Sequence, residues 1–181
     1  GGGGGYQSAG GRGGGAVYIV ASGDAEINGR ITANGEDGQS GYGGGGSGGS
    51  IYLQCRALKG VNGVISANGG SHTSANGGGS GGGGGRVAVV YDPAAQAAQN
   101  LIARPQIMFS ANQGLVSNNQ NTWPDRTGDK SWGRPGTLYF PDQQLFPQPL
   151  TGGGVIEIPG ATAFLLNSLT VSNGYLVFPA G

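Results

Sequence analysis

The chain has very little charge. Only 10% of its residues are charged, and nine basic side chains balance nine acidic ones, so the formal net charge is zero. A neutral chain has no electrostatic attraction for nucleic acid or for an anionic membrane. It also lacks a run of about twenty apolar residues, so we expect no membrane-spanning segment. These absences argue against nucleic acid and membrane partners.

Cysteine and histidine each occur once, as Cys55 and His72. A single cysteine forms no internal disulfide, and Cys55 is expected to be a small buried apolar residue. His72 has no second histidine or partner cysteine with which to share a transition metal. The glycine runs lack the regularly spaced aspartate of calcium-binding glycine repeats. We therefore expect no metal site and no cofactor.

Carboxylates that could carry catalysis are few. The candidates are three pairs, Asp24 with Glu26, Glu36 with Asp37, and Asp125 with Asp129. A hydrolase or lyase needs carboxylates that converge with a base or calcium. The positions matching Glu36 and Asp37 in the next repeat are Gly70 and Ser71, so the repeat does not preserve the second pair. We interpret these residues as solvated loop carboxylates and predict that the protein is not an enzyme.

Glycine is what the chain has in excess, with 43 residues of 181. Glycine loses the most conformational entropy on folding, so either the chain is disordered or its backbone packs against backbone. The hydrophobic content of 36%, which falls in short blocks between the glycines, argues against disorder. The sequence opens on "GGGGG" without a methionine. This start is typical of a processed chain or of a fragment.

An internal repeat organises the first half. The blocks "GGGAVYIVA" (13–21), "GGSIYLQCRAL" (48–58) and "GGGRVAVVY" (83–91) align with Val17, Ile51 and Val87 in register. The offsets are 34 and 36 residues. The inward side chains of each strand are expected at alternate positions.

A second element repeats in phase with the first. "INGRITANG" (27–35) matches "VNGVISANG" (61–69), and "IMFSANQG" (107–114) is a looser third copy. Asn-Gly pairs, as at 34–35 and 68–69, are expected to supply the positive φ of turns. Each unit thus reads as strand, short turn, strand and glycine-rich return.

Such a unit cannot bury its apolar face alone, so successive units must stack. The sequence predicts an all-β fold with little or no helix, a parallel β-solenoid whose glycine-rich, polyproline II-like returns are stacked, so that residues 69–85 are ordered. An antiparallel sandwich is the alternative, because Asn-Gly also makes hairpins. We expect a single elongated domain over 1–181, with glycine-rich repeats (1–92), a loop-rich insertion (93–135) and further strands (136–181).

The insertion has two notable stretches. "DPAAQAAQNLIARP" (92–105) contains good helix formers between two prolines, which fits one short helix or an irregular excursion. The polar stretch 118–136 contains Trp123 and Trp132. These tryptophans could contact a glycan or a partner subunit, or could simply cover the edge of the sheet. The strand pattern resumes at "GTLYF" (136–140), which echoes "SIYL" (50–53).

The runs "GGGGSGGSIYLQCRALKGVNGVISANGG" and "GGGSGGGGGRVAVVYD", with the closing "LNSLTVSNGYLVFPAG", resemble the glycine-rich β-helical repeats of very large bacterial secreted and cell-surface proteins. This resemblance implies an extracellular structural or adhesive role and no catalytic residues. The glycine runs also resemble, more faintly, those of phage tail-tip adhesins, which form packed polyproline II-like helices.

The sequence therefore predicts a structural subunit of an extracellular bacterial filament, matrix fibre or surface layer, with copies of itself as partners. Head-to-tail contact through open strand edges would build such a polymer. The candidate contact residues are Tyr6, Val17, Tyr18, Leu169, Val171, Tyr175, Val177 and Phe178. The alternatives are a glycan- or surface-binding adhesin segment of a larger protein and, less favoured, a polysaccharide-degrading enzyme.

Overall fold

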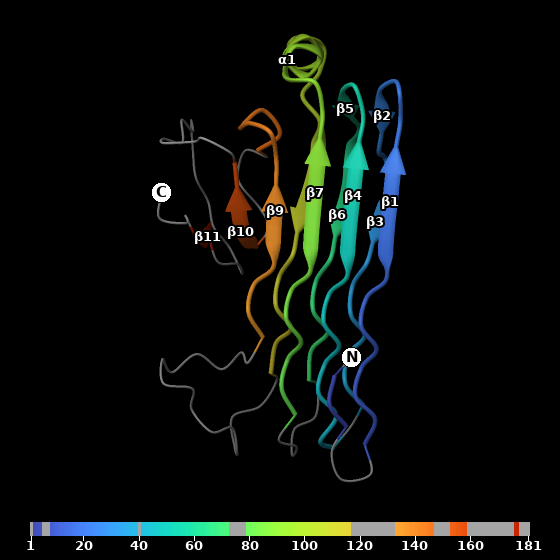
Figure 1. Ribbon diagram of the computed structural model, residues 1–181, viewed down its shortest axis with the longest axis vertical. Coiled ribbons are helices and arrows are strands. Elements are labelled where there is room, and N and C mark those ends of the chain that lie inside the picture. Colours follow the sequence, from blue (N-terminus) through green and yellow to red (C-terminus); the bar gives the residue numbers. More distant parts are fainter. Residues whose placement is uncertain are drawn as a thin grey trace.

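The computed structural model shows an elongated molecule with two facing walls of chain (Figure 1). It describes residues 2–4, 8–39, 41–72, 79–116, 133–146, 153–158 and 176–177. The elements are β1 (Ala16–Val20), β2 (Ala25–Glu26), β3 (Arg30–Thr32), β4 (Ser50–Gln54), β5 (Leu58–Lys59), β6 (Val61–Ser66), β7 (Arg86–Val90), α1 (Pro93–Ile102), β8 (Gln106–Ser110), β9 (Thr137–Tyr139), β10 (Gly154–Glu157) and β11 (Leu176–Val177). We call residues 8–39, 41–72 and 79–116 the first, second and third unit.

The strands form three separate sheets. The front wall is a sheet in the order β1-β4-β7-β9-β10-β11, the back wall is β3-β6-β8, and β2 pairs with β5 near the top of the view (Figure 1). Within each unit the chain ascends through the front wall and descends through the back wall. Every strand pairing in the described part is parallel. The alternative of an antiparallel sandwich is therefore wrong.

The repeat alignment is confirmed at the level of strand register. Val17 lies opposite Ile51, and Ile51 lies opposite Val87. In the back wall Ile31 lies opposite Ile65, which in turn lies opposite Phe109 of the looser third copy. Paired residues of neighbouring strands are thus 34 and then 36 residues apart in the front wall, and 34 and then 44 residues apart in the back wall.

The predicted parallel β-solenoid is wrong. The described residues are mostly strand, with one short helix within the stretch 92–105. The described strands belong to three open sheets, and no closed or solenoid sheet is formed among them. Glycine segments interrupt the ladders below the strands. At the other end of the strands, away from the glycine segments, α1 lies where a third strand of the β2-β5 sheet would be. The helix spans ten residues. The helix begins at an N-cap, where the Asp92 carboxylate accepts hydrogen bonds from the backbone N–H groups of Ala94 and Ala95.

The hydrophobic core fills the space between the two walls at the level of the strands. The front wall contributes Ile51, Leu53 and Val87, and the back wall contributes Ile65 and Phe109. All five side chains are almost fully buried. Other members of the core cluster come from β5 and from the segments that follow β4, β7 and β9, such as Leu58, Cys55, Tyr91, Phe140 and Phe146.

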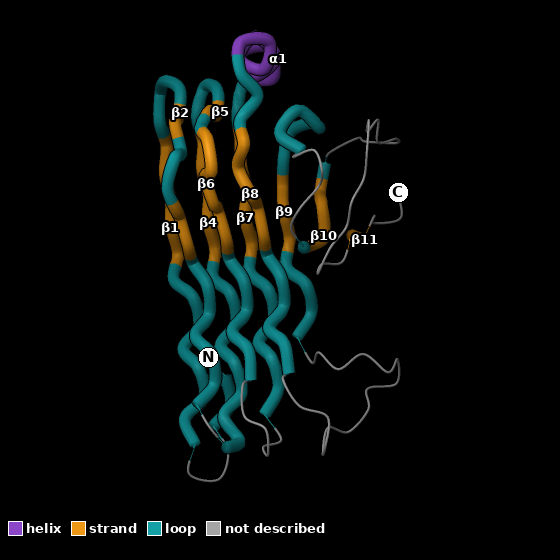
Figure 2. Tube along the Cα trace, turned by 180° about the vertical axis from the view of Figure 1, so that it is seen from behind, coloured by secondary structure: helices purple, strands orange, loops and turns teal. Residues whose placement is uncertain are grey.

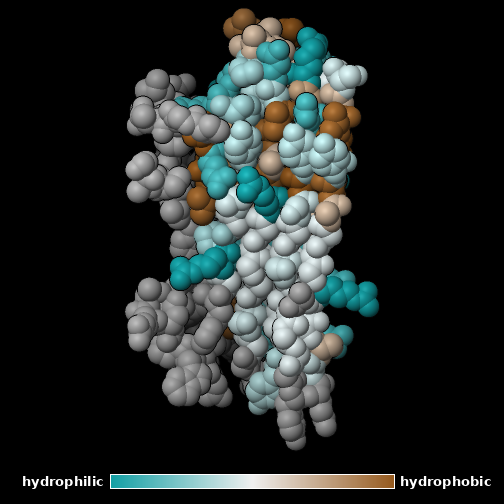
Figure 3. Space-filling view, viewed as in Figure 1, coloured by the Kyte–Doolittle hydropathy of each residue, from teal (hydrophilic) through white to brown (hydrophobic). Residues whose placement is uncertain are grey.

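Below the strands the two walls continue as segments without regular secondary structure (Figure 2), and these segments are rich in glycine. We call these segments the glycine bundle. It comprises the ascending segments 8–15, 43–49, 79–85 and 133–136 and the descending segments 33–39, 67–72 and 111–116. Its surface is close to neutral in hydropathy, whereas apolar side chains gather over the strands above it (Figure 3).

Direct backbone hydrogen bonds join the two walls of the bundle. The N–H of Gly49 donates to Ala33 O at 2.7 Å, and the N–H of Gly82 donates to Gly70 O at 2.8 Å. The two described parts of the segment 69–85 are held by such bonds, while residues 73–78 lie outside the described residues. Glycine is required here for close approach, because a Cβ on Gly82 would lie 2.0 Å from Gly46 O.

The Asn-Gly pairs of the back wall do not make the predicted turns. Asn34 Oδ1 accepts a hydrogen bond from Asn68 N, and Asn68 Oδ1 accepts one from Asn112 N, both at 2.8 Å. These asparagines therefore form a ladder from unit to unit. Of the residues in the four Asn-Gly pairs at 28–29, 34–35, 62–63 and 68–69, only Asn62 has a positive φ, of 59°.

Candidate functional site: the open face of the first unit

The outer edge of β1 has no neighbouring strand among the described residues. The N–H of Ser50 donates to Gly15 O, and the N–H of Ala21 donates to Gln54 O, so odd-numbered residues of this segment bond to β4. Because backbone groups alternate in direction along a strand, the N–H and C=O groups of Ala16, Tyr18 and Val20 face outward. This edge is a template for pairing with another strand.

The core is also open at this edge. Val17, Ile19 and Ile31 of the first unit are only partly buried, although they pack against the core cluster. Their counterparts in the second unit, Ile51, Leu53 and Ile65, are 1%, 0% and 0% exposed. The same side-chain positions are therefore covered wherever a preceding unit exists and uncovered in the first unit.

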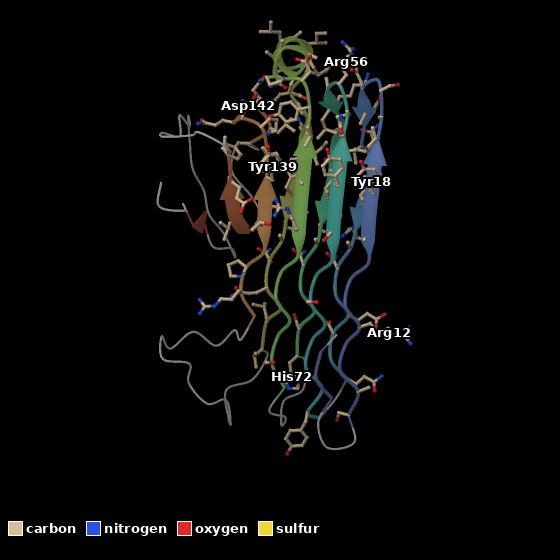
Figure 4. The ribbon with its side chains drawn as sticks, viewed as in Figure 1. Arg12, Tyr18, Arg56, His72, Tyr139 and Asp142 are labelled. Atoms are coloured by element: carbon tan, nitrogen blue, oxygen red, sulfur yellow. The ribbon has the colours of Figure 1, made fainter. Side chains whose placement is uncertain are left out.

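An aromatic pair stands on the outward surface of the same edge. The rings of Tyr18 and Tyr52 are stacked, with centroids 5.0 Å apart and an angle of 10° between their planes. Tyr18 is 75% exposed, and it marks the β1 side of the sheet (Figure 4). Its ring therefore presents one covered and one open face.

The structure describes only part of the predicted contact set. Val17 and Tyr18 belong to the open face, and the backbone of Val177 pairs through β11 with β10. The other predicted contact residues, Tyr6, Leu169, Val171, Tyr175 and Phe178, lie outside the described residues, as do the glycan candidates Trp123 and Trp132. Sequence reasoning missed the outward row of Ala16 and Val20, which strand alternation could have found.

The candidate catalytic carboxylates have structural contacts. Asp24 forms an ion pair with Arg56 at 2.8 Å, and Glu26 accepts a hydrogen bond from Asn28. Asp37 accepts a hydrogen bond from the backbone N–H of Ser71 at 2.6 Å. Asp125 and Asp129 lie outside the described residues.

His72 is fully buried in the glycine bundle, where its Nδ1 lies 2.8 Å from Gly43 O (Figure 4). Because a carbonyl oxygen only accepts, the Nδ1–H of His72 is the donor of this hydrogen bond. Within the described ranges, no three His, Cys, Asp or Glu side chains gather in a way that could hold a metal ion. His72 is therefore built into the packing of the bundle.

Two buried acidic protons predict how stability depends on pH. Burial raises the pKa of the Cys55 thiol, with a smaller contribution from Asp24. Burial, followed by the hydrogen bond from the Tyr91 hydroxyl to Asp142, raises the pKa of Tyr91 far above its ordinary value. The folded state keeps both protons where the unfolded chain releases them, at about pH 8.5 for cysteine and about pH 10 for tyrosine.

We therefore expect stability to be full below about pH 8.5 and to fall as the pH rises further. Each group should lower the free energy of unfolding by about 1.4 kcal/mol per pH unit between its unfolded pKa and its raised pKa in the folded state. Denaturant unfolding between about pH 8 and 11 measures this, and Tyr91→Phe should remove the steeper loss above about pH 10. A stability that stayed constant over this range would contradict the buried thiol and phenol.

Comparisons with protein-family models, with curated proteins and with solved structures give no match to this chain. Within the described residues, no helix has both the length and the apolar character needed to cross a membrane. The site therefore has to be interpreted from its own geometry.

Proposed function

We propose that the protein is a structural subunit of an extracellular bacterial filament, matrix fibre or surface layer, and that it assembles head to tail. The observation that carries this proposal is the open face of the first unit. There an unpaired strand edge and a partly uncovered core lie together, whereas the matching residues of the second unit are buried.

Physical chemistry favours closing this face. Burying one large aliphatic side chain contributes about 1.5–3 kcal/mol, and Val17, Ile19 and Ile31 would each gain part of that. Natural proteins usually protect open strand edges with charge, proline or a covering segment. The front edge "AVYIV" contains neither charge nor proline, and no described strand pairs with its outer side, so it suits use as a joint. A joint between two different faces repeats from copy to copy and gives a filament when its rotation does not close into a ring.

The test is assembly of the full chain in solution. We expect the wild-type protein to form filaments in negative-stain images and to sediment faster as its concentration rises. Tyr18→Lys places a charge on the edge and should reduce assembly at least tenfold. Leu101→Lys is the matched control, because Leu101 is 90% exposed but lies on α1 and should leave assembly unchanged. A wild-type chain that stayed monomeric at high concentration with native β-structure would sink the filament.

A further inference from the structure

We propose that the open face of the first unit binds a unit of a second copy of the chain in parallel register, and that Gly15 and Gly29 admit its backbone. This inference rests on the proposed function and adds the chemistry of the contact. The partner supplies backbone carbonyl groups, and the first unit supplies glycines without a Cβ at the points where those carbonyls would lie.

Gly15 belongs to a row of glycines that precede the front strands. A Cβ on Gly49 would lie 1.9 Å from Gly15 O, and one on Gly85 would lie 2.0 Å from Gly49 O. A Cβ on Gly136 would lie 1.9 Å from Gly85 O. Each of these glycines is therefore required by the carbonyl of the unit before it. A Cβ on Gly15 would meet nothing within 4 Å, and its φ is not positive.

Gly29 repeats this relation in the back wall. Its counterpart is Gly63, because Arg30 pairs with Val64. A Cβ on Gly63 would lie 2.4 Å from Ile27 O of the preceding unit, whereas a Cβ on Gly29 would meet nothing within 4 Å. Both walls of the first unit thus have a glycine that the described chain does not require. Both positions have counterparts that are glycine because another unit's backbone lies against them.

Hydrogen-bond donors point to the same occupant. The N–H of Gly49 donates to Ala33 O, and the N–H of Asn68 donates to Asn34 Oδ1 of the preceding unit. The equivalent donors in the first unit, the N–H groups of Gly15 and Asn34, have no such acceptor among the described residues. Other backbone bonds between units run the opposite way, as from the N–H of Gly14 to Ser47 O, so neighbouring units exchange donors and acceptors. An incoming unit must therefore present acceptors to the N–H groups of Gly15 and Asn34 and donors to the outward C=O groups of β1.

The face continues an interface that the chain already contains. The contact between the first and second units recurs between the second and third, with the same register in both walls. A second copy carries the same kind of strands and glycine segments, so it can supply the missing carbonyl groups and cover Val17 and Ile31. We therefore assign the face to a second copy of the chain.

The experiment compares the wild-type full chain with three glycine variants over a range of concentrations. Sedimentation velocity measures association, and hydrogen exchange measures protection of the outward amides of Ala16, Tyr18 and Val20. We expect these amides to exchange at least tenfold more slowly at high concentration than at low concentration. Gly15→Ala and Gly29→Ala should fold normally at low concentration, because the space is open, but should associate at least tenfold more weakly.

Gly23→Ala is the matched control. A Cβ on Gly23 also meets nothing within 4 Å, but its counterpart in the second unit is Arg56, so no carbonyl is expected there. This variant should associate like the wild type. Equal association of Gly15→Ala and the wild type, or association without protection of β1, would overturn the inference and leave the filament standing.

The remaining outcomes also distinguish this inference from the filament proposal. If the β1 amides are protected only at high concentration but assembly stops at small oligomers, the inference holds and the filament fails. If they are protected equally at every concentration, a segment of the same chain covers the face and the second copy is excluded. If the chain stays monomeric with unprotected β1 amides, both proposals are wrong.

Discussion

Gly82→Ala is expected to destabilise the protein by about 3 kcal/mol or more, enough to prevent folding of the glycine bundle at moderate temperature. The added Cβ would lie 2.0 Å from Gly46 O, and the bundle has no flexible side chain there that could move aside. Gly82 also donates its N–H to Gly70 O and accepts a hydrogen bond from Gly114 N, both at 2.8 Å. Displacing this one residue therefore strains bonds to both neighbours.

The adjacent residue provides the control for this prediction. A Cβ on Gly83 would have Arg134 O as its nearest neighbour, at 3.6 Å, which is ordinary contact. Gly83→Ala should be neutral or stabilise by about 0.4–1 kcal/mol, because alanine restricts the unfolded chain. Denaturant unfolding of the two variants measures the difference. If both variants unfolded at the wild-type midpoint, close packing of backbone against backbone would not be what stabilises the bundle.

The sequence predicted which residues of neighbouring strands lie opposite each other, but not the contacts that join the front wall to the back wall within the glycine bundle. Matching blocks place Val17, Ile51 and Val87 side by side, because a shift by one residue would turn the inward apolar side chains of a strand to the outer face. The repeat pattern of the sequence does not predict the backbone hydrogen bonds between the two walls. These bonds depend on how closely the glycine segments approach each other. A run of glycines has the same sequence in a flexible linker as in a packed bundle, so the sequence does not distinguish the two.

The candidate site was predictable in part for a similar reason. The exposed edge residues Val17 and Tyr18 follow from the position of the first strand. The role of Gly15 does not follow, because in the sequence it is one glycine among many. Only the comparison with Gly49 and Gly85, whose missing Cβ atoms are explained by neighbouring carbonyls, distinguishes it.

The second large effect is expected at Gln96 of α1. It is fully buried, and its amide pairs with both backbone groups of Leu58. The Leu58 N–H donates to Gln96 Oε1 at 2.7 Å, and Gln96 Nε2 donates to Leu58 O at 3.0 Å. The side chain thus occupies the place that a third strand would take beside β5, and it closes that sheet edge.

Gln96→Leu keeps a similar volume but leaves the N–H and C=O of buried Leu58 without partners. Each unpaired buried group costs about 1–3 kcal/mol, so we expect a loss of about 2–5 kcal/mol in the free energy of unfolding. Gln99→Leu, on the same helix, removes only a bond from Gln99 Nε2 to Ala103 O and should cost less than about 1 kcal/mol. Denaturant unfolding compares the two variants. Equal losses would show that the β5 edge does not need its amide partner. A loss specific to Gln96→Leu would show that the Gln96 amide satisfies the open edge of β5 in place of a further strand.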